Sequence, residues 1–211
     1  MMLGARTAAW AKSGGGVITF LDYATSKDGS YFDTGVKIHQ RPDAFKLKFR
    51  INSIRPGMGD YSYDSIFGAR SNYIYQVRYN GGSGIVNIEF YDASGHYWDN
   101  QKPNEWIVIG VDAVSRKVYL NDDHSQTEAN RNVTLDNTAW LGDVNMTGMS
   151  WKNVPADFDC AYLKLYTNNT WSHEYLPAIV DGVVGFYETN SKTFHPSEGT
   201  APFIAGPKKA V

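Results

Sequence analysis

Aromatic side chains beside small polar ones are the residues of this chain that most directly suggest a chemistry. An aromatic ring offers an apolar face to one side of a pyranose ring, and neighbouring amides and carboxylates can bind hydroxyls. Binding residues often lie in loops on a rigid scaffold, so such groups predict contact with a glycan or a host receptor. Filling of the core is the alternative. Three groups occur: Tyr97, Trp98, Asp99 and Asn100; Trp151 and Asn153; and Trp171 with Asn168 and Asn169.

Carboxylates spaced for glycoside hydrolysis are hard to find in this sequence. A retaining glycosidase holds two carboxylates about 5–5.5 Å apart, and alternate residues of a strand share a face. Glu89 and Asp92 have odd spacing and would point to opposite faces. Asp157 and Asp159 could share a face, but a solvated turn beside Pro155 explains them better. We therefore expect that the protein is not an enzyme.

A nucleophilic cysteine or a zinc site is also not indicated. Cys160, the single cysteine, would need a nearby base to be activated, and a lone cysteine in a strand is typically a small buried apolar residue. No intrachain disulfide can form, so the sequence gives no sign of an oxidising compartment. The histidines are scattered and lack the spacing of zinc ligands; they are His39, His96, His124, His173 and His195.

Oxygen ligands for calcium form one dense group. Asn121, Asp122 and Asp123 follow each other, and Asp60 and Asp64 lie in another predicted loop. Calcium is bound by flexible cages of such oxygens, although a polar hairpin tip explains the first group equally well. We expect no cofactor, with calcium as the open alternative.

Period-two alternation predicts the strands that must position these residues. In the clearest case apolar residues alternate with cations: Phe45, Leu47, Phe49 and Ile51 against Lys46, Lys48 and Arg50. Similar patterns cover 73–79, 86–90, 107–111 and 118–120, and residues 80–84 predict a hairpin turn. Near the end, Ala161, Leu163 and Leu165 are expected on one face and Cys160, Tyr162, Lys164 and Tyr166 on the other. If exposed, Tyr73, Tyr75 and Tyr79 would form a protein-binding patch.

Length and charge restrict the possible classes. A β-sandwich of 211 residues is commonly one domain. A net charge of −2 argues against a non-specific nucleic-acid binder, although it is compatible with a local basic patch, and no apolar run is long enough to span a membrane. Arg6 interrupts the apolar N-terminal segment, which makes it a poor signal peptide. We expect an arm with a glycine-rich joint at 1–16, a sandwich at 17–207 and a tail at 208–211.

A resemblance to a known fold family rests on three segments. Residues 160–207 contain a strand pattern followed by Gly-Val-Val-Gly-Phe-Tyr-Glu, Lys-Thr-Phe-His-Pro and Gly-Thr-Ala-Pro-Phe. This order resembles the C-terminal end of concanavalin-A-like and laminin-G-like jelly-roll domains of bacterial surface and prophage structural proteins. Tyr31–Val36 and Ile66–Arg70 also match. The resemblance spans 17–207 and implies an all-β, two-sheet antiparallel jelly-roll sandwich.

The resemblance also implies a setting. It suggests a non-catalytic structural or adhesion module of a phage or prophage particle, at the virion or cell surface, which contacts a glycan or host receptor. Residues 1–16 would anchor it to virion proteins or to further copies of itself. The alternative is a carbohydrate-binding module of a gut bacterium. Glycoside hydrolysis is disfavoured, because glucanases of this fold carry a Glu-x-Asp-x-x-Glu strand that this chain lacks.

Residues 160–207 are expected to serve the fold rather than a site. Their glycines predict turns or positive φ, and the phenylalanines between them predict burial. Because the two ends of a jelly roll tend to pair, this segment should lie beside Val17–Tyr23.

Overall fold

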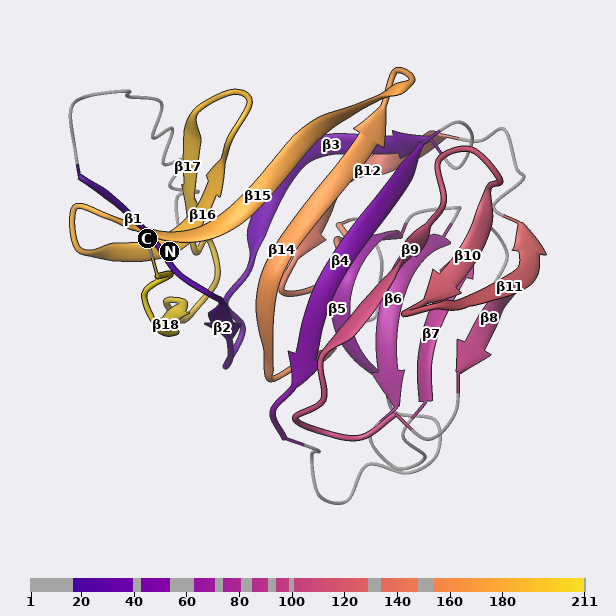
Figure 1. The fold of residues 1–211 in the computed structure, drawn as a ribbon, viewed down its shortest axis with the longest axis horizontal. Helices are drawn as coiled ribbons and strands as arrows, with labels where there is room; N and C mark the ends of the chain where they lie inside the picture. The colour runs from indigo at the N-terminus through magenta and orange to yellow at the C-terminus, as the bar shows by residue number, and fades with distance from the viewer. Residues whose placement is uncertain are drawn as a thin grey trace, which may run out of the picture.

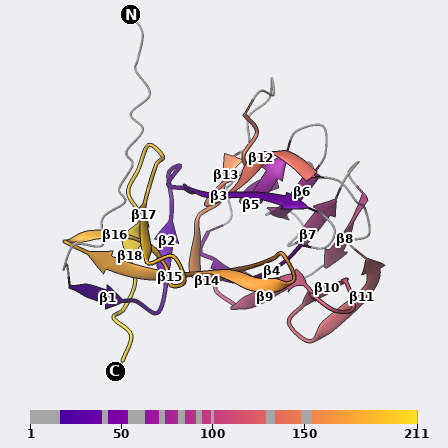
Figure 2. The same cartoon turned by 90° about the horizontal axis from the view of Figure 1, so that it is seen from above.

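The chain folds as a β-sandwich. The computed structural model describes residues 17–39, 43–53, 63–70, 74–80, 85–90, 94–98, 101–128, 134–147 and 154–210. These residues form two stacked sheets (Figures 1 and 2) and contain no helix. Within the described ranges there is accordingly no helix that could cross a membrane. The all-β, two-sheet class expected from the sequence is confirmed.

The larger sheet crosses the whole molecule and faces the viewer in Figure 1. Its main path is β11 (Asp123–Glu128), β10 (Lys117–Leu120), β9 (Ile107–Val111), β4 (Ala44–Ile51), β14 (Phe158–Thr167), β15 (Thr170–Val180), β16 (Val183–Glu188) and β17 (Thr193–Pro196). Three short strands join it at one end: β1 (Ile18–Phe20), β2 (Ala24–Ser26) and β18 (Ile204–Ala205). All of its ladders are antiparallel.

The smaller sheet lies behind it. Its order is β3 (Phe32–His39), β12 (Thr134–Leu141), β5 (Tyr63–Arg70), β6 (Ile74–Asn80), β7 (Ile85–Phe90) and β8 (Ser94–Trp98), with β13 (Val154–Pro155) beside β5. The β13–β5 ladder is parallel and the others are antiparallel. The predicted hairpin is confirmed, since β6 pairs with β7 from Tyr75↔Phe90 to Asn80↔Ile85.

The core lies between the sheets, where the alternating apolar residues meet. Phe45, Leu47 and Phe49 of β4 are fully buried, as the alternation predicts. Tyr75 and Tyr79 of β6 are fully buried too. Since they face the opposing sheet, the predicted protein-binding patch is wrong for these two tyrosines. Tyr73, its third member, lies outside the described residues.

One strand departs from simple alternation. The register of β14 against β4 shifts between Cys160↔Phe49 and Tyr162↔Lys48, which leaves Ala161 as an extra residue. Such a β-bulge changes which residues face the core. Cys160 is therefore buried together with Leu163 and Leu165, and the expected placement of Ala161 with the leucines is wrong. The expectation that Cys160 is a buried apolar residue is confirmed, and its burial raises the pKa of the thiol.

The two ends of the chain pair with each other, as predicted. Ile18 lies opposite Val180, and β2 pairs with β18. Lys209 continues this contact by donating its backbone N–H to Phe20 O at 3.0 Å. Phe186 is buried against Phe32 and Phe203, with ring centroids 5.2 Å away in each case. Residues 160–207 thus hold the two ends of the described chain together, and we call this segment the structural seam. Part of it also borders the groove described below.

Glycines in this seam act in two ways. Gly182 has a φ of +81°, which fits the predicted turn role. Gly199 serves packing instead, because a Cβ there would lie 1.8 Å from the Gly29 carbonyl oxygen.

Candidate functional site

The first aromatic group predicted from the sequence does not form an open binding surface. Trp98 of β8 is only 6% exposed, and its indole Nε1 donates to Asp123 at 3.1 Å. This burial contradicts the expectation that Trp98 stacks on a ligand, because its ring packs in the core. Asp99, Asn100, Trp151 and Asn153 lie outside the described residues, as does the side chain of Tyr97.

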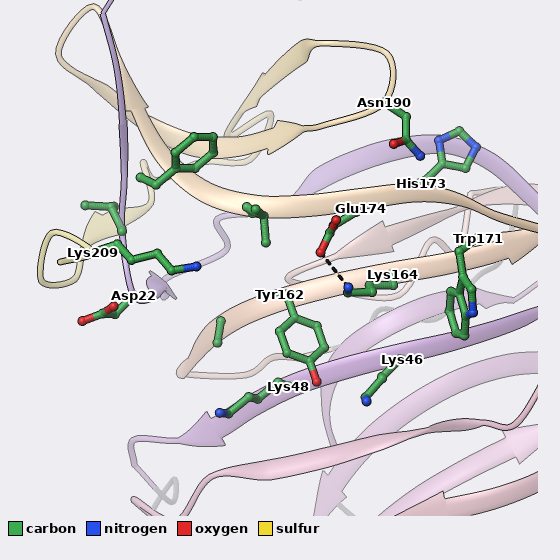
Figure 3. A pocket seen from close by; sticks show the side chains of 14 residues that line it. Asp22, Lys46, Lys48, Tyr162, Lys164, Trp171, His173, Glu174, Asn190 and Lys209 are labelled. Carbon is green, nitrogen blue, oxygen red and sulfur yellow. Dashed lines mark ion pairs between the residues drawn. The ribbon is translucent and has the colours of Figure 1, made fainter. Parts of the chain in front are cut away.

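A groove on the outer face of the larger sheet offers a better candidate. It encloses about 680 Å³, within the typical range of ligand sites, and Figure 3 shows its lining side chains. We call it the lysine groove. It is lined by Phe20, Leu21, Asp22, Lys46, Lys48, Ala161, Tyr162, Lys164, Trp171, His173, Glu174, Leu176, Asn190 and Lys209.

Strand register places the central groove residues side by side. Alternation on β4 turns Lys46 and Lys48 away from the core. The bulge at Ala161 then brings Tyr162 opposite Lys48 and Lys164 opposite Lys46. Without it, burial of Cys160 would turn Tyr162 and Lys164 inward as well. The bulge therefore builds the groove, and Ala161 itself lines it.

The groove carries an excess of positive charge. Four lysines line it against two carboxylates, Asp22 and Glu174. Glu174 lies opposite Lys164, and its Oε1 forms an ion pair with Lys164 Nζ at a distance of 2.7 Å, as Figure 3 shows. Lys46 and Lys164 also lie directly opposite each other, and like charges in this relation destabilise a sheet. Within the described part of the chain, no ion pair neutralises Lys46 or Lys48.

Aromatic rings share the groove with these cations. Tyr162 is half-buried, with the Nζ of Lys164 5.7 Å from its ring centroid. Burial, reinforced by the neighbouring Cys160 and Glu174, raises the pKa of Tyr162. Its hydroxyl therefore remains protonated at neutral pH and can donate a hydrogen bond.

Trp171, the third aromatic candidate of the sequence, does lie at the groove. Its side chain is 42% exposed and meets Tyr166 edge-on at 5.5 Å. The turn that precedes it consists of Asn168 and Asn169, with φ values of 52° and 62°. Two successive positive φ values are typical of tight two-residue hairpins, and asparagine tolerates them well. The asparagines thus form the turn that positions the tryptophan, and neither of them lines the lysine groove.

A second charged cluster lies on the same face, next to the bulge. Arg50 Nε donates to Asp159 at 2.7 Å, and its guanidinium lies 4.8 Å from the Tyr23 ring and 4.9 Å from the Trp106 ring. Asp159 also accepts from Thr25 at 2.6 Å and Asn52 at 2.8 Å. We call this the arginine cluster. The alternative of Asp159 in a solvated turn is wrong, because this carboxylate is 2% exposed and belongs to β14.

Two of the calcium candidates, Asn121 and Asp123, bind other groups, and Asp64 lies buried in β5 rather than in the predicted loop. Asn121 accepts a hydrogen bond from the Val108 N–H through its side-chain oxygen at 2.9 Å, and Asp123 accepts from Trp98. Among the residues that the structure describes, no three His, Cys, Asp or Glu side chains gather as a metal site would require. Asp60 lies outside those residues.

Sequence reasoning identified Trp171 but missed the groove as a unit. Alternation in the sequence predicted that the lysines of β4 point outward, but no local pattern predicted a β-bulge at Ala161. The pairing of β4 with β14 joins residues more than a hundred positions apart.

Comparison with known proteins supports the fold. No family model matches the sequence, and no curated protein matches it. Among solved structures, the chain is similar to "a putative carbohydrate binding protein from Bacteroides ovatus ATCC 8483", with a TM-score of 0.51 and 14% identity. The match covers 89% of this chain and 62% of that one, so the chain spans less than two thirds of its neighbour. At this identity the likeness shows a shared β-sandwich architecture.

Proposed function

We propose that this protein is a non-catalytic carbohydrate-binding module and that the lysine groove is its binding site. The observation that carries the proposal is an open groove in which Tyr162 and Trp171 lie among lysine ammonium groups. Aromatic faces can stack on sugar rings, and the ammonium and phenol groups can donate to ring hydroxyls. The solved neighbour described as carbohydrate-binding has the same architecture, which supports this choice among the functions that a sandwich can host.

A glycan array followed by calorimetry tests the proposal. Trp171→Ala should weaken binding of a glycan hit about fivefold or more, because stacking contributes on the order of 1 kcal/mol. Trp171→Phe, which keeps an aromatic face, is the matched control and should retain most of the affinity. Absence of any glycan hit for the wild-type protein, or equal affinities for all three proteins, would reject the lysine groove as a sugar site.

A role as a surface adhesin or particle component remains a further prediction. Its anchor, residues 1–16, lies outside the described residues. Deletion of residues 1–13 should leave the sandwich folded and its glycan binding unchanged while abolishing assembly. Light scattering of the purified proteins is the measurement, and normal assembly of the truncated protein would contradict the anchor.

A further inference from the structure

We propose that the lysine groove selects acidic polysaccharides, whose sugars carry carboxylate or sulfate groups. This inference rests on the proposed carbohydrate-binding function and names its ligand class. Neutral sugars need donors, acceptors and a stacking surface. They do not need several cations in one groove.

The placement of the lysines is the first reason. Lys46 and Lys164 face each other across adjacent strands, an arrangement that opposes folding. Glu174 neutralises only one of these two charges, through its ion pair with Lys164. An anionic group bound between Lys46 and Lys164 would relieve this repulsion, so part of the ligand's affinity comes from charges that the free protein leaves opposed.

The extent of the charge is the second reason. Lys46 and Lys48 are two residues apart on β4, so their Cα atoms are about 7 Å apart along the strand. Lys209 reaches the other end of the groove from the C-terminal segment (Figure 3). Several cations spread along a groove suit a chain with repeated anionic groups better than one isolated anion.

The setting of the charge is the third reason. The whole chain carries a net charge of −2, so the excess of lysine is local to this groove. The negative net charge argues against a protein that attracts polyanions over its whole surface. The exposed Trp171 ring and the Tyr162 ring add contacts that a sugar can use, and this combination favours an acidic glycan over a nucleic acid.

Lysine also suits such a ligand chemically. An ammonium group is a compact donor that can bind carboxylate, sulfate and hydroxyl oxygens in varied directions. Arg50, the arginine of β4, is already held by Asp159 and two aromatic rings. Lys48 lies over one of these rings, with its Nζ 5.5 Å from the Trp106 centroid, but like Lys46 it has no ion-pair partner in the described part of the chain. The ammonium groups of these two lysines therefore remain to meet a ligand.

Matched polysaccharides test the inference. Biolayer interferometry with immobilised polygalacturonate, fully methyl-esterified pectin, dextran sulfate and dextran separates acidic from neutral chains and carboxylate from sulfate. Binding to at least one acidic polymer should exceed binding to its neutral partner about tenfold or more, since hydrogen bonds to charged groups contribute about 1.5–3 kcal/mol each. The polymer that binds identifies the anionic group.

Charge-matched variants locate the effect. Lys46→Gln with Lys48→Gln should weaken binding to the acidic polymer about tenfold or more. Lys37→Gln with Lys102→Gln removes the same charge at two exposed positions outside the groove and should change binding by less than about twofold. Neither double variant should lose stability, because all four side chains lie outside the core, and the Lys46→Gln change should give a small gain by removing one of two opposed charges.

The outcomes separate this inference from the proposed function. Equal binding of acidic and neutral polymers, lost on Trp171→Ala, keeps the carbohydrate site and overturns the acidic selectivity. Equally tight binding of poly-glutamate, unaffected by Trp171→Ala, would show a general polyanion surface and also overturn it. Binding to none of the four polymers would overturn the acidic selectivity, and only the further absence of any hit on the glycan array would reject the carbohydrate site as well.

Discussion

Two regions on the outer face of the larger sheet hold their cations in different surroundings. On the Asp159 side of the bulge, Arg50 forms an ion pair with Asp159 and lies against the Tyr23 and Trp106 rings. On the Tyr162 side of the bulge, Lys46 and Lys48 project from the same strand into the lysine groove without an ion-pair partner among the described residues, although Lys48 Nζ also lies 5.5 Å from the Trp106 ring centroid. Both sets come from the same alternation on β4. They differ in what β14 presents opposite them, a buried carboxylate in one case and Tyr162 with Lys164 in the other.

This difference separates charge that holds the fold from charge that is available to a ligand. A buried ion pair is strongly destabilising to break, because the remaining partner is left uncompensated. Lys46 and Lys48 are half-buried and have no ion-pair partner among the described residues, so they can be changed at smaller cost in stability than a charge with a buried partner. We therefore expect substitutions in the arginine cluster to act on stability and those in the lysine groove to act on binding.

Removal of the bulge should have the largest effect. Deletion of Ala161 would force β14 into regular alternation and turn either Cys160 or the Leu163–Leu165 side away from the core. We expect a loss of more than about 4 kcal/mol in the free energy of unfolding, the range of severe core damage. Chemical denaturation measures it. Ala161→Ser, which keeps the chain length, should remain near wild type, and a stable deletion variant would contradict the role of the bulge.

Removal of the carboxylate of the arginine cluster should come next. Asp159→Ala leaves Arg50 without its ion-pair partner and should lower the free energy of unfolding by about 3–5 kcal/mol. Glycan affinity, measured below the lowered melting temperature, should stay within about twofold. Asp122→Ala, in an exposed turn, is the control and should change stability by less than about 0.5 kcal/mol. Loss of binding without loss of stability would place Asp159 in the site instead.

Two tryptophans extend the comparison to aromatic residues. Trp98→Ala should lower the free energy of unfolding by about 3–5 kcal/mol, as expected for a buried ring. Trp171→Ala should change it by less than about 1 kcal/mol while weakening glycan binding. Thermal melts and calorimetry on both variants decide the matter, and a reversed pattern would show that the two rings have been assigned the wrong roles.

Freeing Lys164 from its ion pair with Glu174 should affect ligand binding more than stability. Glu174→Gln removes the carboxylate that pairs with Lys164 across β14 and β15. Because this pair is partly exposed, stability should fall by less than about 1 kcal/mol. Affinity for an acidic polysaccharide should rise severalfold, since one more ammonium group faces the ligand. Unchanged affinity in the interferometry assay would mean that Lys164 does not contact the anionic groups.

The smallest expected effect is a gain in stability. Lys46→Gln removes one of two opposed charges, and stability should rise by about 0.2–1 kcal/mol. Denaturation at low ionic strength gives the best resolution, because salt screens the repulsion. A loss of stability would show that the Lys46 stem or its charge supports the sheet.

The sequence by itself determined the fold class and the direction of many side chains. Alternation on β4 placed Phe45, Leu47 and Phe49 in the core and their cationic neighbours outside, as the structure confirms. Turn residues after an alternating segment correctly predicted the hairpin between β6 and β7. These features follow from period two and turn chemistry, which short stretches of sequence encode directly. The pairing of the chain ends was also predicted correctly, but from the resemblance to jelly rolls rather than from alternation.

Only the tertiary structure decided where the candidate site lies. Burial of Trp98 depends on what packs over β8, and the tyrosines of β6 face inward because the other sheet covers them. Most decisive is Ala161, whose place as an extra residue depends on the register of β14 against β4. That register is set by contacts between distant segments. Local alternation therefore predicted the wrong face for Cys160, and the grouping of Tyr162 and Lys164 with the β4 lysines became visible only once the strands were paired.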